Sequence, residues 1–204
     1  MSKNLKKLEG FVKAKLANDQ SGHDYPHIKR VLSNAMLITK GQRSVDKDVL
    51  IATCLLHDIV FKTDSPKTHS MDSAKAAEKI LPKFGFTKEE TAKIANAIHY
   101  HNRGFAGVKG HRYSLEERIL CDADRIDSLG AVGIARMVQF CAKRGLPMLV
   151  SRSDRVNESL YGSMKFQASL AKDMFTPEGK RIAKARTAVM NDFIGQLENE
   201  CRKC

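Results

Sequence analysis

The side chains best suited to chemistry are His57 and Asp58, which directly follow the apolar run 51–56. An imidazole and a carboxylate at the end of a buried helix are costly to desolvate unless a partner compensates them. A divalent cation would be such a partner, and His27 and Asp124 supply two more ligands of the same types. These four side chains therefore predict a metal site for hydrolysis.

The predicted ligand set combines two neutral nitrogens with two anionic oxygens. Such a set suits Mn, Fe, Co, Ni, Zn or a tightly held Mg, and it does not choose among these metals. Four protein ligands on an octahedral ion leave two positions, one for water and one for a phosphate oxygen. Because a bound ion lowers the pKa of its water and polarises phosphorus, we expect hydrolysis of a phosphate compound.

Helices must position these side chains, because apolar residues recur at helical spacing along the chain and strand-type alternation is scarce. We expect the first three helices over residues 3–17, 27–39 and 47–59. Capping boxes, in which a side chain and the backbone satisfy each other's amides, predict helix starts at Thr87 and Ser114. Asp46 is a further expected N-cap. These signals predict an all-α fold.

The C-terminal part continues the helical pattern. Gly130 is expected to end or kink the helix that precedes it, and Thr176 with Pro177 predicts the start of the last helix. An apolar stripe is expected along that helix at Ile182, Val189, Phe193 and Leu197. The whole pattern predicts one domain over residues 1–204, with its core over 20–145 and C-terminal helices over 157–199.

Composition narrows the class of protein. A chain of 204 residues is long enough for one well-buried domain. The net charge of +12 attracts polyanions, but the Lys and Arg residues are scattered and tryptophan is absent, so nucleic-acid binding is not expected. No apolar stretch approaches the roughly 20 residues of a membrane span. We expect a cytoplasmic protein that does not bind membranes.

Three joined motifs resemble the HD-domain metal-dependent phosphohydrolases. They are Gly-His-Asp-Tyr-Pro-His-Ile-Lys-Arg-Val at 22–31, Leu-Leu-His-Asp-Ile at 55–59 and Asp-Ala-Asp-Arg-Ile-Asp-Ser-Leu-Gly at 122–130. The resemblance continues through 134–136 and 179–181 and is strongest to the small stand-alone bacterial and archaeal members, some of which hydrolyse nucleoside triphosphates. It implies a single HD-type helical bundle with a C-terminal helical extension.

The same resemblance implies that His27, His57, Asp58 and Asp124 are the metal ligands. Asp124 is chosen over its neighbours because related proteins show the pattern Ala-Asp-x-x-Asp. Asp127 and Arg30 would then support the ligands from outside the coordination sphere. Asp122, which points elsewhere on the helix, is expected at the surface or in a cap.

Three further histidines have two readings. In binuclear relatives, histidines at comparable places bind a second ion, but here Tyr100 separates His99 from His101, and side chains two apart on a helix diverge. We therefore prefer one ion, with Asp58, His69 and His99 acting in catalysis and His101 contacting the substrate. A structural role for His69 or His99 stays open.

Basic residues near these motifs are expected to bind the substrate. After the His-Asp pair only Lys62 offers a charge, so no carboxylate is expected there as a general acid. In the glycine-rich segment 103–112, Arg103, Lys109 and Arg112 could clamp a polyphosphate by charge-assisted hydrogen bonds. An ordinary solvated loop is the alternative.

The preferred function is hydrolysis of a nucleoside triphosphate, or of a related small phosphorylated nucleotide, by water activated on a divalent metal such as manganese. Cleavage between the α- and β-phosphates rests on the resemblance alone. A nucleotide phosphomonoesterase is one alternative. A non-catalytic regulatory or nucleic-acid-binding helical protein with a structural metal site is another, and homodimerisation is left open.

Overall fold

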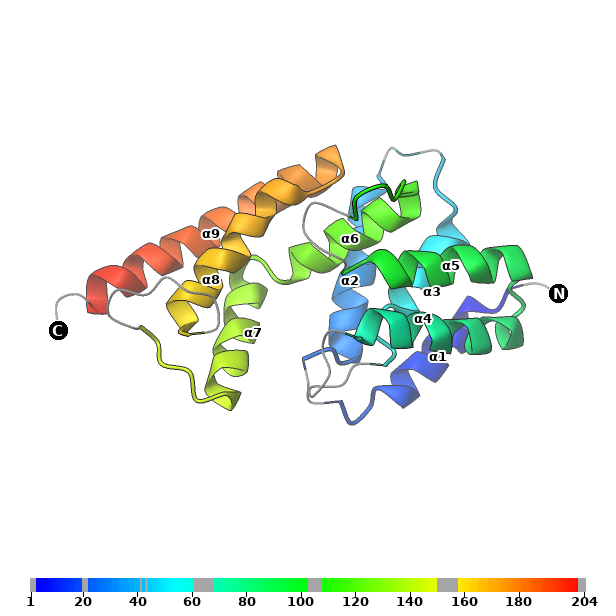
Figure 1. The fold of residues 1–204 in the computed structure, drawn as a ribbon, viewed down its shortest axis with the longest axis horizontal. Helices are drawn as coiled ribbons and strands as arrows, with labels where there is room; N and C mark the ends of the chain where they lie inside the picture. The colour runs from blue at the N-terminus through cyan, green and yellow to red at the C-terminus, as the bar shows by residue number, and fades with distance from the viewer. Residues whose placement is uncertain are drawn as a thin grey trace. The chain divides into compact units, whose positions relative to one another are not determined.

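Every regular element in the described part of the chain is helical (Figure 1). The structure, a computed structural model, describes residues 3–19, 22–40, 42, 44–60, 68–102, 108–149 and 158–201. Its α-helices are α1 (Leu5–Lys15), α2 (Tyr25–Ile38), α3 (Lys47–Leu56), α4 (His69–Ile80), α5 (Lys88–Tyr100), α6 (Leu115–Asp127), α7 (Gly130–Lys143), α8 (Leu160–Ser169) and α9 (Pro177–Cys201). Two 3-10 helices are η1 (Leu81–Phe84) and η2 (Leu170–Asp173). The all-α prediction is confirmed.

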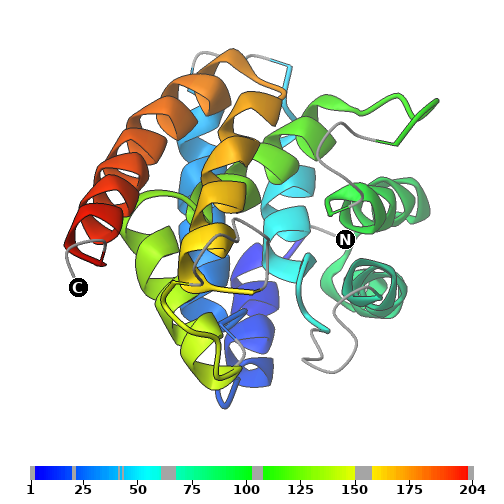
Figure 2. The ribbon, with the colours of Figure 1, turned by 60° about the vertical axis from the view of Figure 1, so that its left-hand side comes forward.

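The chain divides into two compact units, residues 1–123 and residues 124–204, and the division falls inside α6. In the first unit, α3 contacts α1, α2, α4 and α5, and α4 packs along α5. Figure 2 shows α4 and α5 nearly end-on and next to each other. Among the helices described here, none has the length and apolarity needed to cross a bilayer.

Helix α3 lies in the core of the first unit. Val49, Leu50 and all residues from Ala52 to Leu56 are buried, which leaves only its first turn and one later side chain in contact with solvent. A helix that is apolar all round is stable only when other elements surround it. The sequence 51–56 therefore places the end of α3, and the His-Asp pair that follows it, inside the protein.

The predicted helix starts are confirmed by their hydrogen bonds. The Asp46 carboxylate accepts from the amides of Asp48 and Val49, both at 3.1 Å. Thr87 and Glu90 form a reciprocal capping box at α5. The same pattern starts α6, where the Glu117 amide donates to Ser114 Oγ at 3.2 Å and the Ser114 amide donates to Glu117. Thr176 accepts from the Gly179 amide at 2.9 Å and starts α9.

Helices α7, α8 and α9 build the second unit and contact one another. The expected break at Gly130 is present, since α6 ends at Asp127 and Gly130, with φ +69°, begins α7. A Cβ atom at Gly133 would lie 2.1 Å from the Ser128 carbonyl oxygen and 3.1 Å from Met190 Cε. Glycine at this position therefore permits the tight turn from α6 into α7.

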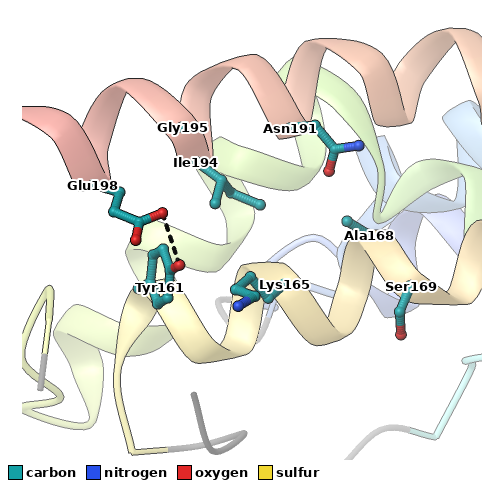
Figure 3. A pocket seen from close by; sticks show the side chains of 8 residues that line it. All are labelled: Tyr161, Lys165, Ala168, Ser169, Asn191, Ile194, Gly195 and Glu198. Atoms are coloured by element: carbon teal, nitrogen blue, oxygen red, sulfur yellow. Dashed lines mark hydrogen bonds between the residues drawn. The ribbon is translucent and has the colours of Figure 1, made fainter. Parts of the chain in front are cut away.

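The predicted apolar stripe of α9 is wrong in its register. Val189 and Phe193 are 50% and 38% exposed, whereas Ala183, Met190 and Ile194 are buried. The two stripes are one residue apart, and helical periodicity alone does not decide which of them faces the neighbouring helices. Figure 3 shows the contact with α8, where Tyr161 donates to Glu198 at 3.0 Å beside a surface groove of about 450 Å³.

Candidate metal centre

The buried end of α3 delivers His57 and Asp58 to the candidate site. His57 follows the last residue of α3 with helical backbone angles, and its exposure is 0%, compared with 2% for Asp58. The chain then turns, and the Val60 amide donates to Ser73 Oγ on α4 at 3.1 Å. Both side chains are therefore held inside the first unit by the packing of α3 and by this turn.

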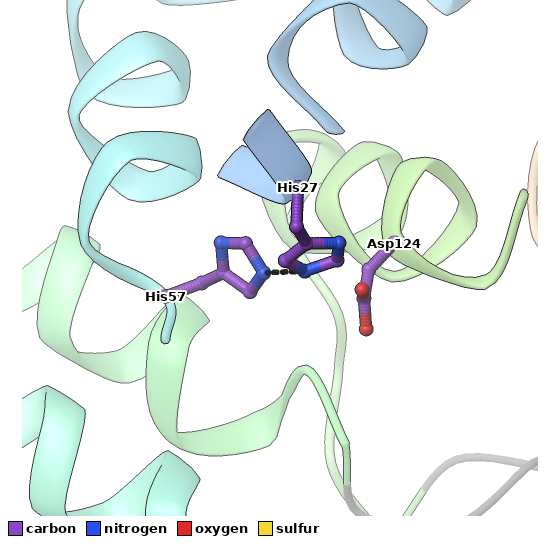
Figure 4. Close-up of side chains that lie close together, drawn as sticks. All are labelled: His27, His57 and Asp124. Atoms are coloured by element: carbon purple, nitrogen blue, oxygen red, sulfur yellow. Dashed lines mark hydrogen bonds between the residues drawn. The ribbon is translucent and has the colours of Figure 1, made fainter. Parts of the chain in front are cut away.

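A first group of ligand atoms comes from His27, His57 and Asp124, and these atoms all lie within 4.8 Å of one another (Figure 4). The two imidazoles face each other with their Nε2 atoms 3.2 Å apart. Nδ1 of His57 lies 2.8 Å from the Cys54 carbonyl oxygen, so it must carry the proton. In the neutral ring Nε2 of His57 then has the lone pair, the form in which histidine binds metals.

Helix starts and cross-helix hydrogen bonds place the other two members. His27 is the third residue of α2, and its amide donates to the N-cap side chain of Asp24 at 2.9 Å. Asn34 Nδ2, also on α2, donates to the Ala123 carbonyl oxygen at 3.1 Å. Because α6 continues unbroken past Ala123, this bond fixes the backbone next to Asp124 against α2.

A second group comes from Asp58, His69 and His101, whose ligand atoms also lie within 4.8 Å of one another. Asp58 Oδ1 is 3.5 Å from His69 Nε2 and 3.6 Å from His101 Nε2. Nδ1 of His101 lies 2.6 Å from the Ile98 carbonyl oxygen, so the proton sits on Nδ1 and Nε2 has the lone pair. The first residue of α4 and the residue after α5 thus meet at Asp58.

The Asp58 carboxylate connects the two groups. Its Oδ2 atom lies 3.5 Å from His57 Nε2 and 3.6 Å from His27 Nε2, whereas its Oδ1 atom faces His69 and His101. Burial alone would raise the pKa of this carboxyl, but the neighbouring imidazoles, with His57 foremost, outweigh that cost and hold the pKa well below its usual range. The carboxylate is therefore anionic at neutral pH.

This donor set fits a divalent metal. Buried imidazole nitrogens converge on the Asp58 carboxylate at 3.5–3.6 Å, and within the described residues Asp58 Oδ1 accepts no hydrogen bond. Mixed nitrogen and oxygen ligands suit the first-row metals and Mg²⁺. The predicted ligands His27, His57, Asp58 and Asp124 are brought together, although metal binding by them remains a prediction.

The other predicted residues are placed unequally. His69 and His101 join Asp58, whereas His99 is half-buried, contacts Tyr100 edge-on at 4.8 Å and enters neither group. Two side chains separated by one residue point in different directions, so only one of the pair 99 and 101 can face Asp58. His101 takes that place because it caps the end of α5.

The predicted substrate-binding residues are only partly described. Lys62 and Arg103 lie outside the described residues. Lys109 and Arg112 are exposed on the segment that precedes α6, and Arg30 is half-buried on α2, one turn after His27. Their roles remain predictions.

The aspartates near Asp124 differ from expectation in one case. Asp127 is fully buried and accepts from Arg136 Nη1 at 2.7 Å, an ion pair that suits a supporting role. The expectation that Asp122 lies at the surface or in a cap is wrong, since its exposure is 0%. The reason is that α6 is buried on several sides here, as the burial of the consecutive residues 119–123 shows.

Sequence reasoning missed two polar neighbours of the site. His23 Nε2 lies 3.8 Å from Asp58 Oδ2, and the His23 ring meets the His27 ring edge-on at 5.4 Å. Asn102 Nδ2 lies 3.3 Å from His69 Nε2. The available signals were sequence proximity, since His23 precedes His27 by four residues and Asn102 follows His101, but both lie outside helices where periodicity gives no direction.

Comparison with known proteins supports this description. The chain is 27% identical over 202 residues to YpgQ of Bacillus subtilis (strain 168), a match covering 97% of this chain and 94% of YpgQ. An HD-superfamily hydrolase from Bacillus thuringiensis has a TM-score of 0.76 at 27% identity, covering 97% of this chain and 96% of the other. The structure of B. subtilis YpgQ in complex with ADP has a TM-score of 0.75 at 26% identity, covering 96% and 94%.

A Lactobacillus plantarum protein has the same fold, with a TM-score of 0.80 at 24% identity, covering 98% of this chain and 97% of the other. The HD domain family matches residues 25–129, the segment that carries every member of the two ligand groups. This match spans just over half of the chain and includes the buried His-Asp pair. The chain belongs to the HD domain family.

Proposed function

We propose that this protein is a metal-dependent phosphohydrolase that acts on nucleoside triphosphates or a related small phosphorylated nucleotide. The observation that carries the proposal is the convergence of His27, His57, Asp58 and Asp124 in a buried centre. The binding of ADP by YpgQ, which is 27% identical to this chain, supports a nucleotide as the ligand.

In the proposed site, His27, His57, Asp124 and Oδ2 of Asp58 would hold a divalent ion. Such an ion supplies an acidified water and a positive charge that polarises phosphorus. Asp58, His69 and His101 form a second donor set that would suit a second ion, which counts against the preference for a single ion. The metal content per chain tests that preference, and two ions per chain would reverse it.

The surrounding side chains suit the remaining tasks of the reaction. Among the imidazoles around Asp58, that of His23 has the largest exposed fraction, 25%, and can exchange protons with solvent and with a leaving group. Lys109 and Arg112 offer exposed cations for phosphate oxygens. We expect His23→Asn to lower kcat by about 100-fold, as loss of a proton-transfer group does, while the metal content stays that of the parent.

A panel of nucleoside tri-, di- and monophosphates with added Mn²⁺ tests the proposal. We expect triphosphates to be cleaved between the α- and β-phosphates, giving a monophosphate and pyrophosphate. Release of inorganic phosphate from monophosphates would instead identify a nucleotide phosphomonoesterase. The His57→Ala variant provides the background rate.

The same panel separates catalysis from the non-catalytic alternative. A protein that retains a stoichiometric metal ion but turns over none of the nucleotides would be a regulatory or nucleic-acid-binding protein with a structural metal. That outcome would refute the proposed activity. The ligand set is buried and complete, and His23 beside it offers a proton-exchanging group. A purely structural ion needs no such group, so the arrangement favours catalysis.

A further inference from the structure

A buried carboxylate joins α5 to the start of α6 at a distance from both ligand groups. Glu117 is only 3% exposed. Its Oε1 atom accepts from Asn96 Nδ2 on α5 at 2.5 Å, and its Oε2 atom accepts from the Ser114 amide at 2.6 Å and from His111 Nε2 at 3.2 Å. A carboxylate has only acceptor sites, and here three donors occupy them, one from α5 and two from the segment that leads into α6.

His111 extends this connection to the last residue of α5. Its ring stacks on Tyr100 with centroids 3.8 Å apart and planes 15° apart, and Tyr113 meets the same ring edge-on at 4.5 Å. Tyr100 directly precedes His101, the side chain that reaches Asp58. The Glu117 carboxylate thus acts on the turn that carries His101.

A second hydrogen bond joins the same helices one turn further along. Cys121 Sγ on α6 donates to the His101 carbonyl oxygen at 3.4 Å. Cys121 follows Glu117 by four residues on α6, and His101 follows Asn96 by five residues at the end of α5, so the two ties lie about one turn apart on both helices. Two ties spaced by one turn fix the register of α6 along α5.

We propose that Glu117 is a positioning residue for the metal centre. By tying α5 to α6 it holds His101 at Asp58, and it sets the register in which Asp124, two turns further along α6, reaches His27 and His57. Outer hydrogen bonds of this kind orient ligands and tune metal affinity. The inference rests on the proposed function, because it takes His27, His57, Asp58 and Asp124 as metal ligands.

The second capping box of the chain provides a matched control. Glu90 holds the same place in the box at Thr87 as Glu117 holds in the box at Ser114. Glu90 lies at the opposite end of α5 from His101 and pairs with Lys3 at 2.6 Å. Changing it removes a capping carboxylate without touching the contact between α5 and α6.

The test compares Glu117→Ala with Glu90→Ala by titration with Mn²⁺ alone, by nucleotide kinetics and by thermal melting. We expect Glu117→Ala to weaken Mn²⁺ binding by about 10–100-fold and to lower kcat, with little change in KM. Glu90→Ala should bind Mn²⁺ as the parent does. Equal weakening by both variants would show a general loss of helix stability and would overturn the proposal.

Two milder variants keep the test decisive if Glu117→Ala does not fold. Glu117→Gln should recover Mn²⁺ affinity, because its oxygen can accept from Ser114 and His111 while its amide donates to a rotated Asn96. Asn96→Ala removes only the bond between α5 and α6 and should weaken Mn²⁺ binding to a smaller degree. Parent-like affinity in Asn96→Ala, or no recovery in Glu117→Gln, would overturn the positioning role.

Failure of the proposed function would look different. If the parent itself binds no Mn²⁺ and cleaves no nucleotide, the proposed metal centre fails, and the positioning role fails with it. If the parent binds and cleaves while Glu117→Ala matches it in both, only the positioning role fails. A change confined to KM would also overturn it, because KM alone would report a substrate contact.

Discussion

Two buried aspartates, Asp58 in the first unit and Asp127 in the second, are satisfied in opposite ways. Asp127 accepts a guanidinium hydrogen bond from Arg136 at 2.7 Å and forms an ion pair with it. Asp58 instead lies 3.5–3.8 Å from the Nε2 atoms of His23, His27, His57, His69 and His101. An ion pair at hydrogen-bond distance stabilises the fold. Several possible ligand atoms gathered around one carboxylate at longer distances are instead arranged to share a cation.

The largest expected effect follows from removing the shared carboxylate or its neighbour. We expect Asp58→Ala and His57→Ala to lose bound metal and to reduce hydrolysis to background, because each change removes a proposed ligand. Asp192→Asn, on the exposed side of α9, is the control and should keep both properties. Elemental analysis measures the metal and circular dichroism checks the fold; full metal occupancy in both variants would contradict the assignment.

Replacing Asp124 and Asp127 by asparagine, one at a time, tests the contrast between a proposed metal ligand and an ion-paired carboxylate. We expect Asp124→Asn to lose the metal with little change in the free energy of unfolding, since this side chain is half-buried and is proposed as a ligand. Asp127→Asn should keep the metal but lower the free energy of unfolding by about 1–3 kcal/mol, because Arg136 loses its buried charged partner. Urea denaturation and elemental analysis measure the two quantities. The reverse pattern would move the last ligand to Asp127.

Much of the site around Asp58 could be predicted from the sequence, because short-range patterns along the chain determine where the helices begin and which of them is buried. The apolar run before His57 dictates a buried helix, and capping residues dictate where α5, α6 and α9 begin. The resemblance then selected Asp124 among three neighbouring aspartates, and the structure places it beside the His27 ring. Local pattern and motif together predicted that His27, His57, Asp58 and Asp124 would meet, but they did not exclude His99 or single out His23.

The remaining features depend on tertiary packing, which the sequence pattern does not encode. The burial of Asp122 follows from how many sides of α6 are covered, and the register of α9 follows from its contacts with α7 and α8. The joining of His101, rather than His99, to Asp58 depends on where α5 ends. His23 and Asn102 lie in turns, where periodicity predicts no direction.

Exposed cations should contribute less than the buried centre, and their effect should depend on salt. We expect Lys109→Ala combined with Arg112→Ala to raise KM for triphosphates more than for monophosphates, because more phosphate charge is lost from contact. The difference should shrink as salt rises, since exposed charges are screened over about 10 Å at 0.1 M ionic strength. The metal content should stay unchanged. Identical kinetics in the variant and the parent would make this segment an ordinary solvated loop.

The smallest expected effect concerns a half-buried carboxylate near the surface, Glu9, which completes the comparison with the two buried ones. Lys29 Nζ donates to Glu9 Oε1 at 2.6 Å and Tyr25 Oη donates to the same atom at 2.8 Å. These two hydrogen bonds, the one from Lys29 first, lower the pKa of Glu9 below its ordinary value of 4.5. The folded state therefore binds this proton less readily than the unfolded chain does.

The sign of the pH dependence follows from that lowered pKa. The pair stabilises the fold above the unfolded pKa of Glu9, and this contribution is lost as the pH falls through the folded value. We expect Glu9→Gln to cost about 0.2–1 kcal/mol at pH 7, as exposed ion pairs do, and to cost nothing in acid. Denaturation of parent and variant between pH 7 and pH 3 measures the difference, with the exposed Glu78→Gln as control. A difference that persists unchanged in acid would show that the lost contacts, and not the charge, carry the effect.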